Sequence, residues 1–110
     1  MINELRPIME DDFVAFEQYV DKLPPGTIVG KACDVVHCPV AIWWSARYGV
    51  TIWVSFLRHG VGESVSLEQY DFNPMWVRFV VSETDGLCTG EVTKEYMQEY
   101  ILPRVKDHWT

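Results

Sequence analysis

The stretch of residues 33–44 constrains the fold more than any other part of the chain. It holds two of the three cysteines, one of the three histidines and two of the five tryptophans. Within it, Cys38-Pro39 predicts a helix start, because proline at the first helical position lacks only an N–H that has no helical partner and already has a helical φ. The helix should run from Pro39 to Arg47 or Tyr48, with Gly49 as its stop and Cys38 as its N-cap.

Cys38 has two interpretations. As a structural residue it is a small apolar side chain packed beneath Trp43 and Trp44, since free cysteine is among the most buried residue types. As a functional residue it is a thiolate at a helix N-terminus, where unbonded amides and the helix dipole lower a thiol pKa. A structural zinc ion needs four ligands, and the candidates are Cys33, His37, Cys38 and either Cys88 or His59. The C-x3-H-C spacing matches no usual zinc motif, so the structural interpretation is favoured.

The totals predict one domain over residues 1–110 with a sizeable core. Hydrophobic residues make up 48% and aromatic residues 14% of the chain, which excludes disorder for most of its length. Three cysteines cannot pair completely, and neither a signal peptide nor a membrane-length apolar run is present. We therefore expect a cytoplasmic protein without membrane contact, and no motif in the sequence predicts a cofactor.

The charge is strongly acidic. Nine basic and sixteen acidic residues give a formal net charge of −7. Nucleic-acid binders normally need a positive face, so direct nucleic-acid binding is not expected. The charge permits a protein partner with a basic face, although it also serves solubility alone.

The first part of the chain predicts a helix followed by an extended segment. From Ile8 onward, apolar residues recur at three- and four-residue steps on one face, namely Phe13, Phe16, Val20 and Leu23. Leu23-Pro24-Pro25-Gly26 ends this helix. Residues 27–32 then predict a short strand or an extended connection.

The middle of the chain predicts an antiparallel hairpin. Apolar and polar residues alternate over residues 50–57 and again over residues 64–70, with a glycine-containing turn at 58–62 between them. Trp53 falls on the polar face of the first strand. It is therefore either part of the core or an exposed aromatic patch of the kind that marks interfaces.

Two further helices are predicted. Asn73-Pro74 opens one that carries Trp76, Phe79 and Val80 and closes near Asp85-Gly86, with a strand over 76–82 as the alternative. The last begins at Thr93 as N-cap, with Val92 and Met97 as a hydrophobic staple and a kink or break at Pro103. Its expected buried stripe is Met97, Tyr100, Ile101 and Val105. The fold class is therefore α+β, a hairpin or small sheet packed by about four helices.

Two sets of carboxylates recur at helical spacing. Glu91, Glu95 and Glu99 are four residues apart at the last helix and its entry, and Glu17 and Asp21 form a similar pair on the first. They are either a solvated face or an array presented to a basic partner. Small phage-encoded inhibitors of defence nucleases, including anti-CRISPR proteins, often have this size and charge, an analogy of type without a shared motif.

Several short motifs resemble a pattern in small uncharacterised bacterial and phage proteins. They are Gly30-Lys31-Ala32 (G-x-A), Cys38-Pro39-Val40-Ala41 (C-P-x-A), and Pro74 and Trp76 followed by Phe79-Val80 and Asp85. The resemblance covers about residues 23–105, and that family has no assigned activity. It implies only that Cys38 and Trp76 belong to a common core design.

Three functional hypotheses follow. The first is a non-enzymatic interaction protein that binds a basic protein surface through its acidic helices or its hairpin. The second is a small thiol-dependent or metal-binding protein centred on Cys33, His37 and Cys38. The third is a dimeric structural module joined through hairpin edges or Trp53, so both monomer and homodimer stay open. An enzyme is not favoured, because no pattern pairs the carboxylates in a pocket.

Overall fold

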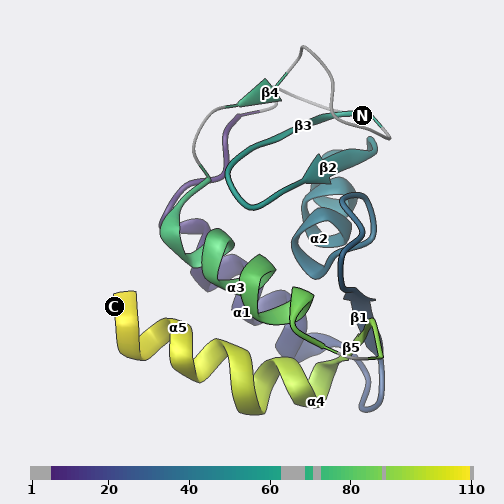
Figure 1. The fold of residues 1–110 in the computed structure, drawn as a ribbon, viewed down its shortest axis with the longest axis vertical. Helices are drawn as coiled ribbons and strands as arrows, with labels where there is room; N and C mark the ends of the chain where they lie inside the picture. Colours follow the sequence, from purple (N-terminus) through teal and green to yellow (C-terminus); the bar gives the residue numbers. More distant parts are fainter. Residues whose placement is uncertain (1–5, 63–68, 71–72, 88, 110) are drawn as a thin grey trace.

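The computed structural model describes residues 6–62, 69–70, 73–87 and 89–109. They form an α+β fold, as predicted (Figure 1). Helices α1 (Asp12–Lys22) and α3 (Met75–Asp85) pack with a long C-terminal helix made of α4 (Lys94–Tyr96), η1 (Met97–Ile101) and α5 (Leu102–Trp109). Helix α2 (Pro39–Tyr48) lies beside a sheet of order β2-β3-β4, and a second sheet pairs β1 with β5. No described helix is long and apolar enough to cross a membrane.

Of the two alternatives for residues 27–32, the short strand is confirmed. Strand β1 (Ile28–Lys31) pairs antiparallel with β5 (Glu91–Thr93), with Lys31 opposite Glu91. Gly30 faces the start of α2, where an added Cβ would lie 2.5 Å from the Pro39 nitrogen. Only glycine allows this approach without displacing the backbone, so the small sheet is seated directly on the α2 N-terminus.

The prediction for α2 is confirmed at both ends. The Cys38 sulfur accepts a hydrogen bond from the Ala41 N–H at 3.4 Å, as an N-cap does. Gly49 ends the helix with φ 72°, the left-handed conformation that glycine adopts without strain. Trp43 and Trp44 are both buried. The second half of the stretch that most constrains the fold, from Cys38 to Trp44, therefore lies in the core.

Aromatic side chains join α1, α2 and α3. The ring centroid of Phe16 lies 5.3 Å from that of Trp43 and 5.3 Å from that of Trp76. Phe13, Phe16 and Val20 are buried, which confirms these three positions of the predicted apolar face. The helix begins at Asp12 rather than at Ile8, and Leu23 is its half-buried C-cap. Offset and edge-to-face ring pairs at these distances stabilise beyond their buried area, so the cluster fixes the three helices together.

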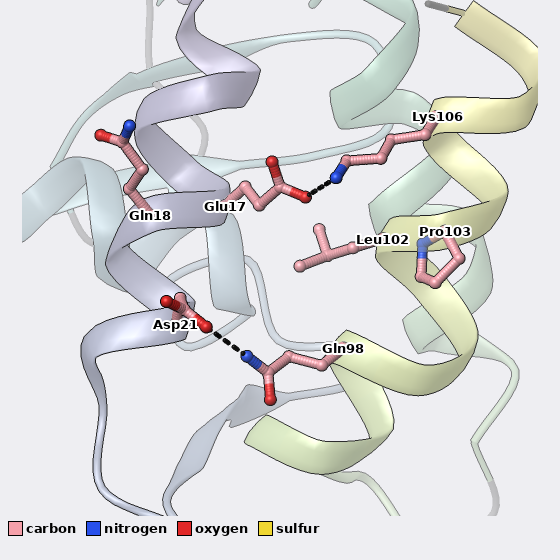
Figure 2. Close-up of a pocket in the computed structure, with 7 residues that line it drawn as sticks. All are labelled: Glu17, Gln18, Asp21, Gln98, Leu102, Pro103 and Lys106. Atoms are coloured by element: carbon pink, nitrogen blue, oxygen red, sulfur yellow. Dashed lines mark hydrogen bonds and ion pairs between the residues drawn. The ribbon is translucent and has the colours of Figure 1, made fainter.

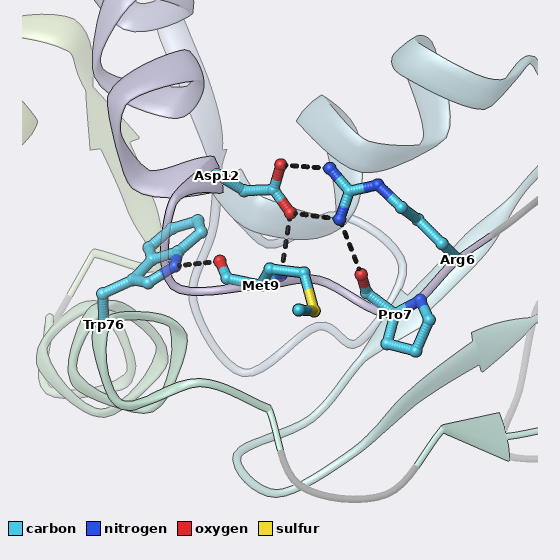
Figure 3. A network of polar contacts seen from close by, with 5 residues as sticks. All are labelled: Arg6, Pro7, Met9, Asp12 and Trp76. Carbon is cyan, nitrogen blue, oxygen red and sulfur yellow. Dashed lines mark hydrogen bonds and ion pairs between the residues drawn. The ribbon is translucent and has the colours of Figure 1, made fainter.

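A buried carboxylate fastens the segment before α1 (Figure 3). Asp12 accepts two hydrogen bonds from Arg6, at 2.6 and 3.0 Å, and one from the Met9 N–H at 2.7 Å. The Trp76 indole N–H donates to the Met9 carbonyl at 3.0 Å. Residues 6–9 are thereby held between α1 and α3, and the Asp12 charge is compensated where it is buried.

The hairpin is formed with a different turn from the one predicted. Residues 58–62 are not the turn: His59–Val61 is strand β3, paired with β2 (Ile52–Val54) so that Val54 lies opposite His59. The chain reverses at residues 55–58 instead, where the Ser55 N–H donates to the Arg58 carbonyl at 2.8 Å. Gly60 is buried and lies directly opposite Trp53 in the β2–β3 pair. This glycine is therefore a strand residue and not part of the turn.

The second predicted strand falls largely outside the described residues. Residues 69–70 form β4 (Gln69–Tyr70), which pairs with β3 and not with β2. Of the two alternatives for Trp53, the core is confirmed and the exposed patch is wrong, because Trp53 is 1% exposed and every residue of β2 is buried. Both faces of this strand are covered, which alternation along one strand does not reveal.

Helix α3 is confirmed, and the strand alternative for 76–82 is wrong. Its buried residues recur with helical period: Trp76, Val77, Val80, Val81 and Thr84. Phe79 is only half-buried. Asn73 is not the N-cap, since Pro74 takes that position. The Asn73 side chain instead bonds the His59 ring, at 2.6 Å, and the Ser55 carbonyl, at 2.7 Å.

The C-terminal helix starts as predicted. The Thr93 hydroxyl accepts from the Tyr96 N–H at 3.1 Å, and Val92 and Met97 are both buried. It does not break at Pro103. In the preceding π-helical turn, the Leu102 N–H donates to the Met97 carbonyl five residues back. The extra residue in this turn rotates the buried stripe, so Tyr100 is 55% exposed and Leu102 is buried in its place.

Candidate functional site

A groove runs between α1 and the C-terminal helix (Figure 2). Its volume is about 410 Å³, and its walls are Glu17, Gln18 and Asp21 on one side and Gln98, Leu102, Pro103 and Lys106 on the other. Glu17 and Asp21 lie one helical turn apart on α1 and therefore share a face. Leu102 projects from the opposite helix between them (Figure 2). The groove thus combines an apolar floor with carboxylates along one wall.

Polar contacts already cross this groove. The Lys106 ammonium lies 2.5 Å from a Glu17 carboxylate oxygen, and the Gln98 side-chain amide donates to Asp21 at 3.1 Å. Lys94 donates to the main-chain carbonyls of Asp21, at 2.8 Å, and Leu23. The charged side chains that line the groove are therefore paired at its surface, where each contact is exchangeable with solvent.

The π-helical turn affects the backbone beside the groove. With the Leu102 N–H bonded to Met97, the next donor in this register is residue 103, which would bond the Gln98 carbonyl. Pro103 has no N–H to supply. Pro103 therefore cannot donate to the Gln98 carbonyl five residues back, at the position where residue 98 lines the groove.

The predicted acidic residues divide into two groups. Glu17 and Asp21 line the groove, whereas Glu91, Glu95 and Glu99 do not. Glu91 lies exposed on β5, and Glu99 is exposed on the last helix. Glu95 accepts the Gly26 N–H with both oxygens, at 3.0 and 3.1 Å, and this bond lowers its pKa. The five carboxylates therefore do not form one continuous row.

Sequence reasoning missed the opposite wall of the groove. Gln98, Leu102 and Lys106 received no role, and Pro103 was considered only as a helix breaker. The available signal was the combination of a proline inside a helical pattern with an apolar residue just before it. That signal predicts the groove wall only if the π-helical turn is known, because the turn decides which side chains face α1. The turn depends on how the helix packs rather than on local spacing.

The residues Cys33, His37 and Cys38 differ in burial and in their hydrogen-bond partners. Cys38 is 2% exposed, and burial raises the pKa of its thiol to about 12, opposite to the lowered pKa that a reactive thiolate requires. Cys33 is exposed, and its N–H donates to Asp85 at 2.8 Å. The exposed His37 ring lies 2.9 Å from Asp34.

No metal centre is assembled by the part of the chain that the structure describes. In those residues, no group of three or more His, Cys, Asp or Glu side chains is close enough to hold an ion. His59 is buried and bonded to Asn73, whereas His37 is exposed. Cys88, the fourth candidate ligand, lies outside the described residues.

No family model, curated protein or solved structure matches this chain. A proposal for its function therefore rests on the geometry and charge of the molecule itself.

Proposed function

We propose that this protein is a non-enzymatic binding domain that receives a basic side chain of a partner protein in the groove between α1 and the C-terminal helix. The observation that carries the proposal is the pairing of two carboxylates, Glu17 and Asp21, with an apolar floor at Leu102 and Pro103. Arginine and lysine have the matching chemistry, an apolar stem that ends in a cation. The net charge of −7 attracts a basic partner toward the whole molecule.

Lys106 illustrates the contact that the partner is expected to make. Its ammonium crosses from the last helix to Glu17 at 2.5 Å. The Lys106 and Glu17 side chains are 51% and 29% exposed, so the pair contributes at most about 1 kcal/mol and is inexpensive to displace. A guanidinium bonds carboxylates with two parallel N–H groups, which favours arginine over lysine as the incoming residue.

The proposed function is protein binding alone. Neither the structure nor the comparisons support a phage origin or nuclease inhibition, so these stay outside it. It includes a cytoplasmic location, because Cys33 and Cys38 are free thiols of the kind that a reducing compartment maintains. It includes neither membrane nor direct nucleic-acid contact.

The test is a titration of the ¹⁵N-labelled protein with acetyl-tetraarginine amide, followed by amide chemical shifts. We expect saturable shifts at Gln18, Asp21, Gln98 and Lys106 that weaken as salt rises from about 20 to about 300 mM. The double variant Glu17→Gln, Asp21→Asn should weaken binding at least about fivefold, and Lys106→Gln, which removes the competing cation, should tighten it.

The matched control is Glu83→Gln, which removes a carboxylate paired with Arg104 at 2.5 Å outside the groove. It should leave the affinity unchanged. Equal weakening by the control variant, or small shifts spread over the entire surface, would show that the peptide responds to net charge alone and would refute the proposal.

A further inference from the structure

Another cavity opens between the start of α2, the 55–58 turn and the end of α3. Its volume is about 240 Å³, and its lining includes three buried residues, Cys38, Val54 and Val81. It shares no lining residue with the groove between α1 and the C-terminal helix. Ligand pockets for small molecules are usually about 300–1,000 Å³, so this cavity suits a single large side chain.

Exposed apolar residues lie at its rim and beside it. Val35 and Phe56 line the cavity and are 36% and 49% exposed, and the neighbouring Leu57 is 45% exposed. The turn that carries Phe56 and Leu57 is held in place by Asn73, whose N–H donates to the Leu57 carbonyl at 2.6 Å and whose side chain donates to Ser55 and Arg58 carbonyls. These apolar side chains are therefore presented on a fixed backbone, which reduces the entropic cost of binding.

Two carboxylates complete the rim. Asp34 accepts N–H groups of Val36 and His37, and its hydrogen bond with the His37 ring lowers its pKa. Asp85 accepts the Cys33 N–H at 2.8 Å. Residues 35–62 contain no carboxylate, and Asp34 and Asp85 are the acidic residues among the described residues that line this cavity. An apolar cavity bounded by negative charge favours an apolar side chain with a cation next to it.

We propose that this cavity is a docking site for a segment of a partner protein in which an aliphatic anchor residue is followed by arginine. The anchor fills the space above Cys38, Val54 and Val81 and packs against Phe56. The guanidinium lies over Asp34 and Asp85. Because the cavity is separate from the groove, the protein has two faces with which to join partners.

Three peptides test the chemistry, each titrated into the ¹⁵N-labelled protein: acetyl-Gly-Leu-Arg-Gly-amide, its Leu-Glu analogue and its Ala-Arg analogue. The Leu-Arg peptide should give saturable shifts at Val35, Phe56 and Asp85 with a Kd of about 1–10 mM. Each analogue should bind at least about fivefold more weakly. Cys33, which lines the cavity and is exposed, should become alkylated more slowly by iodoacetamide as the peptide saturates.

Three surface variants locate the binding. Phe56→Ser removes the apolar rim and should weaken the Leu-Arg peptide about tenfold, and Asp85→Asn, which keeps an acceptor for the Cys33 N–H, about threefold. Tyr100→Ser, at a 55% exposed aromatic residue elsewhere, should have no effect.

Equal binding of the Leu-Glu peptide, equal weakening by Tyr100→Ser, or shifts at Glu17 and Asp21 in place of Val35 would overturn the proposal. Peptide-free shifts that depend on protein concentration and vanish in Phe56→Ser would assign the cavity to a second copy of the chain, and would also overturn it.

Discussion

Two regions of the molecule use polar groups in opposite ways. One is the groove between α1 and the C-terminal helix, and the other is the hairpin end, which comprises β2, the 55–58 turn, β3 and Asn73. Charged side chains at the groove meet each other at the surface, as Lys106 meets Glu17 and as Arg104 meets Glu83 nearby. At the hairpin end, two polar side chains are bonded to each other in the interior: His59 is 1% exposed and Asn73 is 1% exposed. A surface pair exchanges readily with solvent, whereas a buried pair does not.

This difference separates binding from stability. Contacts at the groove are available to a partner because losing them costs the fold little. The Asn73 contacts at the hairpin end hold the turn that carries the exposed Phe56 and Leu57. These contacts therefore affect binding only through the position of those two side chains. Variants of the paired side chains at the groove should therefore affect affinity more than stability, whereas variants of the buried His59–Asn73 pair should affect stability.

The largest contrast concerns two thiols that line one cavity. At about pH 8 a thiol whose pKa is about 12 is ionised in roughly one molecule in 10⁴, and only the thiolate reacts. Iodoacetamide should therefore modify Cys33 at least about 100-fold faster than the buried Cys38. Cleavage before Asp34 separates the two cysteines for mass spectrometry. Equal rates in the folded protein would mean that Cys38 is reachable and that the cavity floor is open.

Asn73→Ala should cost the hairpin end about 2–4 kcal/mol of unfolding free energy. The change removes bonds to the His59 ring and to the Ser55 and Arg58 carbonyls, and it leaves the buried His59 ring without this partner, at about 1–3 kcal/mol. Urea denaturation measures the loss. Ser82→Ala, at an exposed position of α3, is the control and should stay within about 0.5 kcal/mol. A similar small effect for Asn73→Ala would show that the turn holds without this side chain.

The same asparagine marks where sequence reasoning succeeds and where it stops. Helix α2 was predictable from end to end because its signals are local: a proline at the first position, Cys38 before it and Gly49 after it. Asn73 before a proline gave the same local signal, but tertiary bonds to residues 14–18 positions away took its side chain instead. A capping pattern predicts that a helix starts nearby, but it does not predict which group the capping side chain bonds.

The hairpin and the last helix show two further limits. Glycine next to His59 indicated a turn, yet Gly60 lies in strand β3, opposite Trp53. Tyr100 had helical spacing for burial, yet one π turn rotated it to solvent. In the candidate site, Glu17 and Asp21 were predicted from spacing on one helix. Their partners Lys106 and Gln98 depend on how two helices distant in sequence pack together, which single-helix periodicity does not contain.

Lowering the pH should weaken the hairpin end through His59. Burial lowers the pKa of His59 below its ordinary value of 6.5. Asn73 donates through its nitrogen to two carbonyls, so its oxygen faces the ring and the neutral His59 carries its proton on Nδ1. The unfolded chain gains a proton below about pH 6.5 that the folded chain resists. Stability is therefore complete above that pH and falls as the pH drops, by up to about 1.4 kcal/mol per unit.

The window from about pH 6.5 down to pH 5 isolates this effect. Asp34 and Glu95, whose pKa values are lowered in the folded protein, lose their contributions only below the ordinary carboxyl values of 3.8 and 4.5. Urea denaturation at several pH values measures the slope, and it should survive His108→Gln, a change at an exposed histidine. A flat profile between pH 6.5 and 5 would mean that His59 titrates equally in both states.

The smallest effect belongs to the groove. Glu17→Gln removes the pair with Lys106, and because both side chains are partly exposed it should lower the unfolding free energy by less than about 1 kcal/mol. Glu83→Gln, which breaks the equivalent pair with Arg104, should cost about the same. The two variants then differ only in their response to acetyl-tetraarginine amide, which Glu17→Gln alone should weaken. A loss of several kcal/mol for Glu17→Gln would instead make the carboxylate a structural element, because a group that the fold requires is not free to exchange its partner.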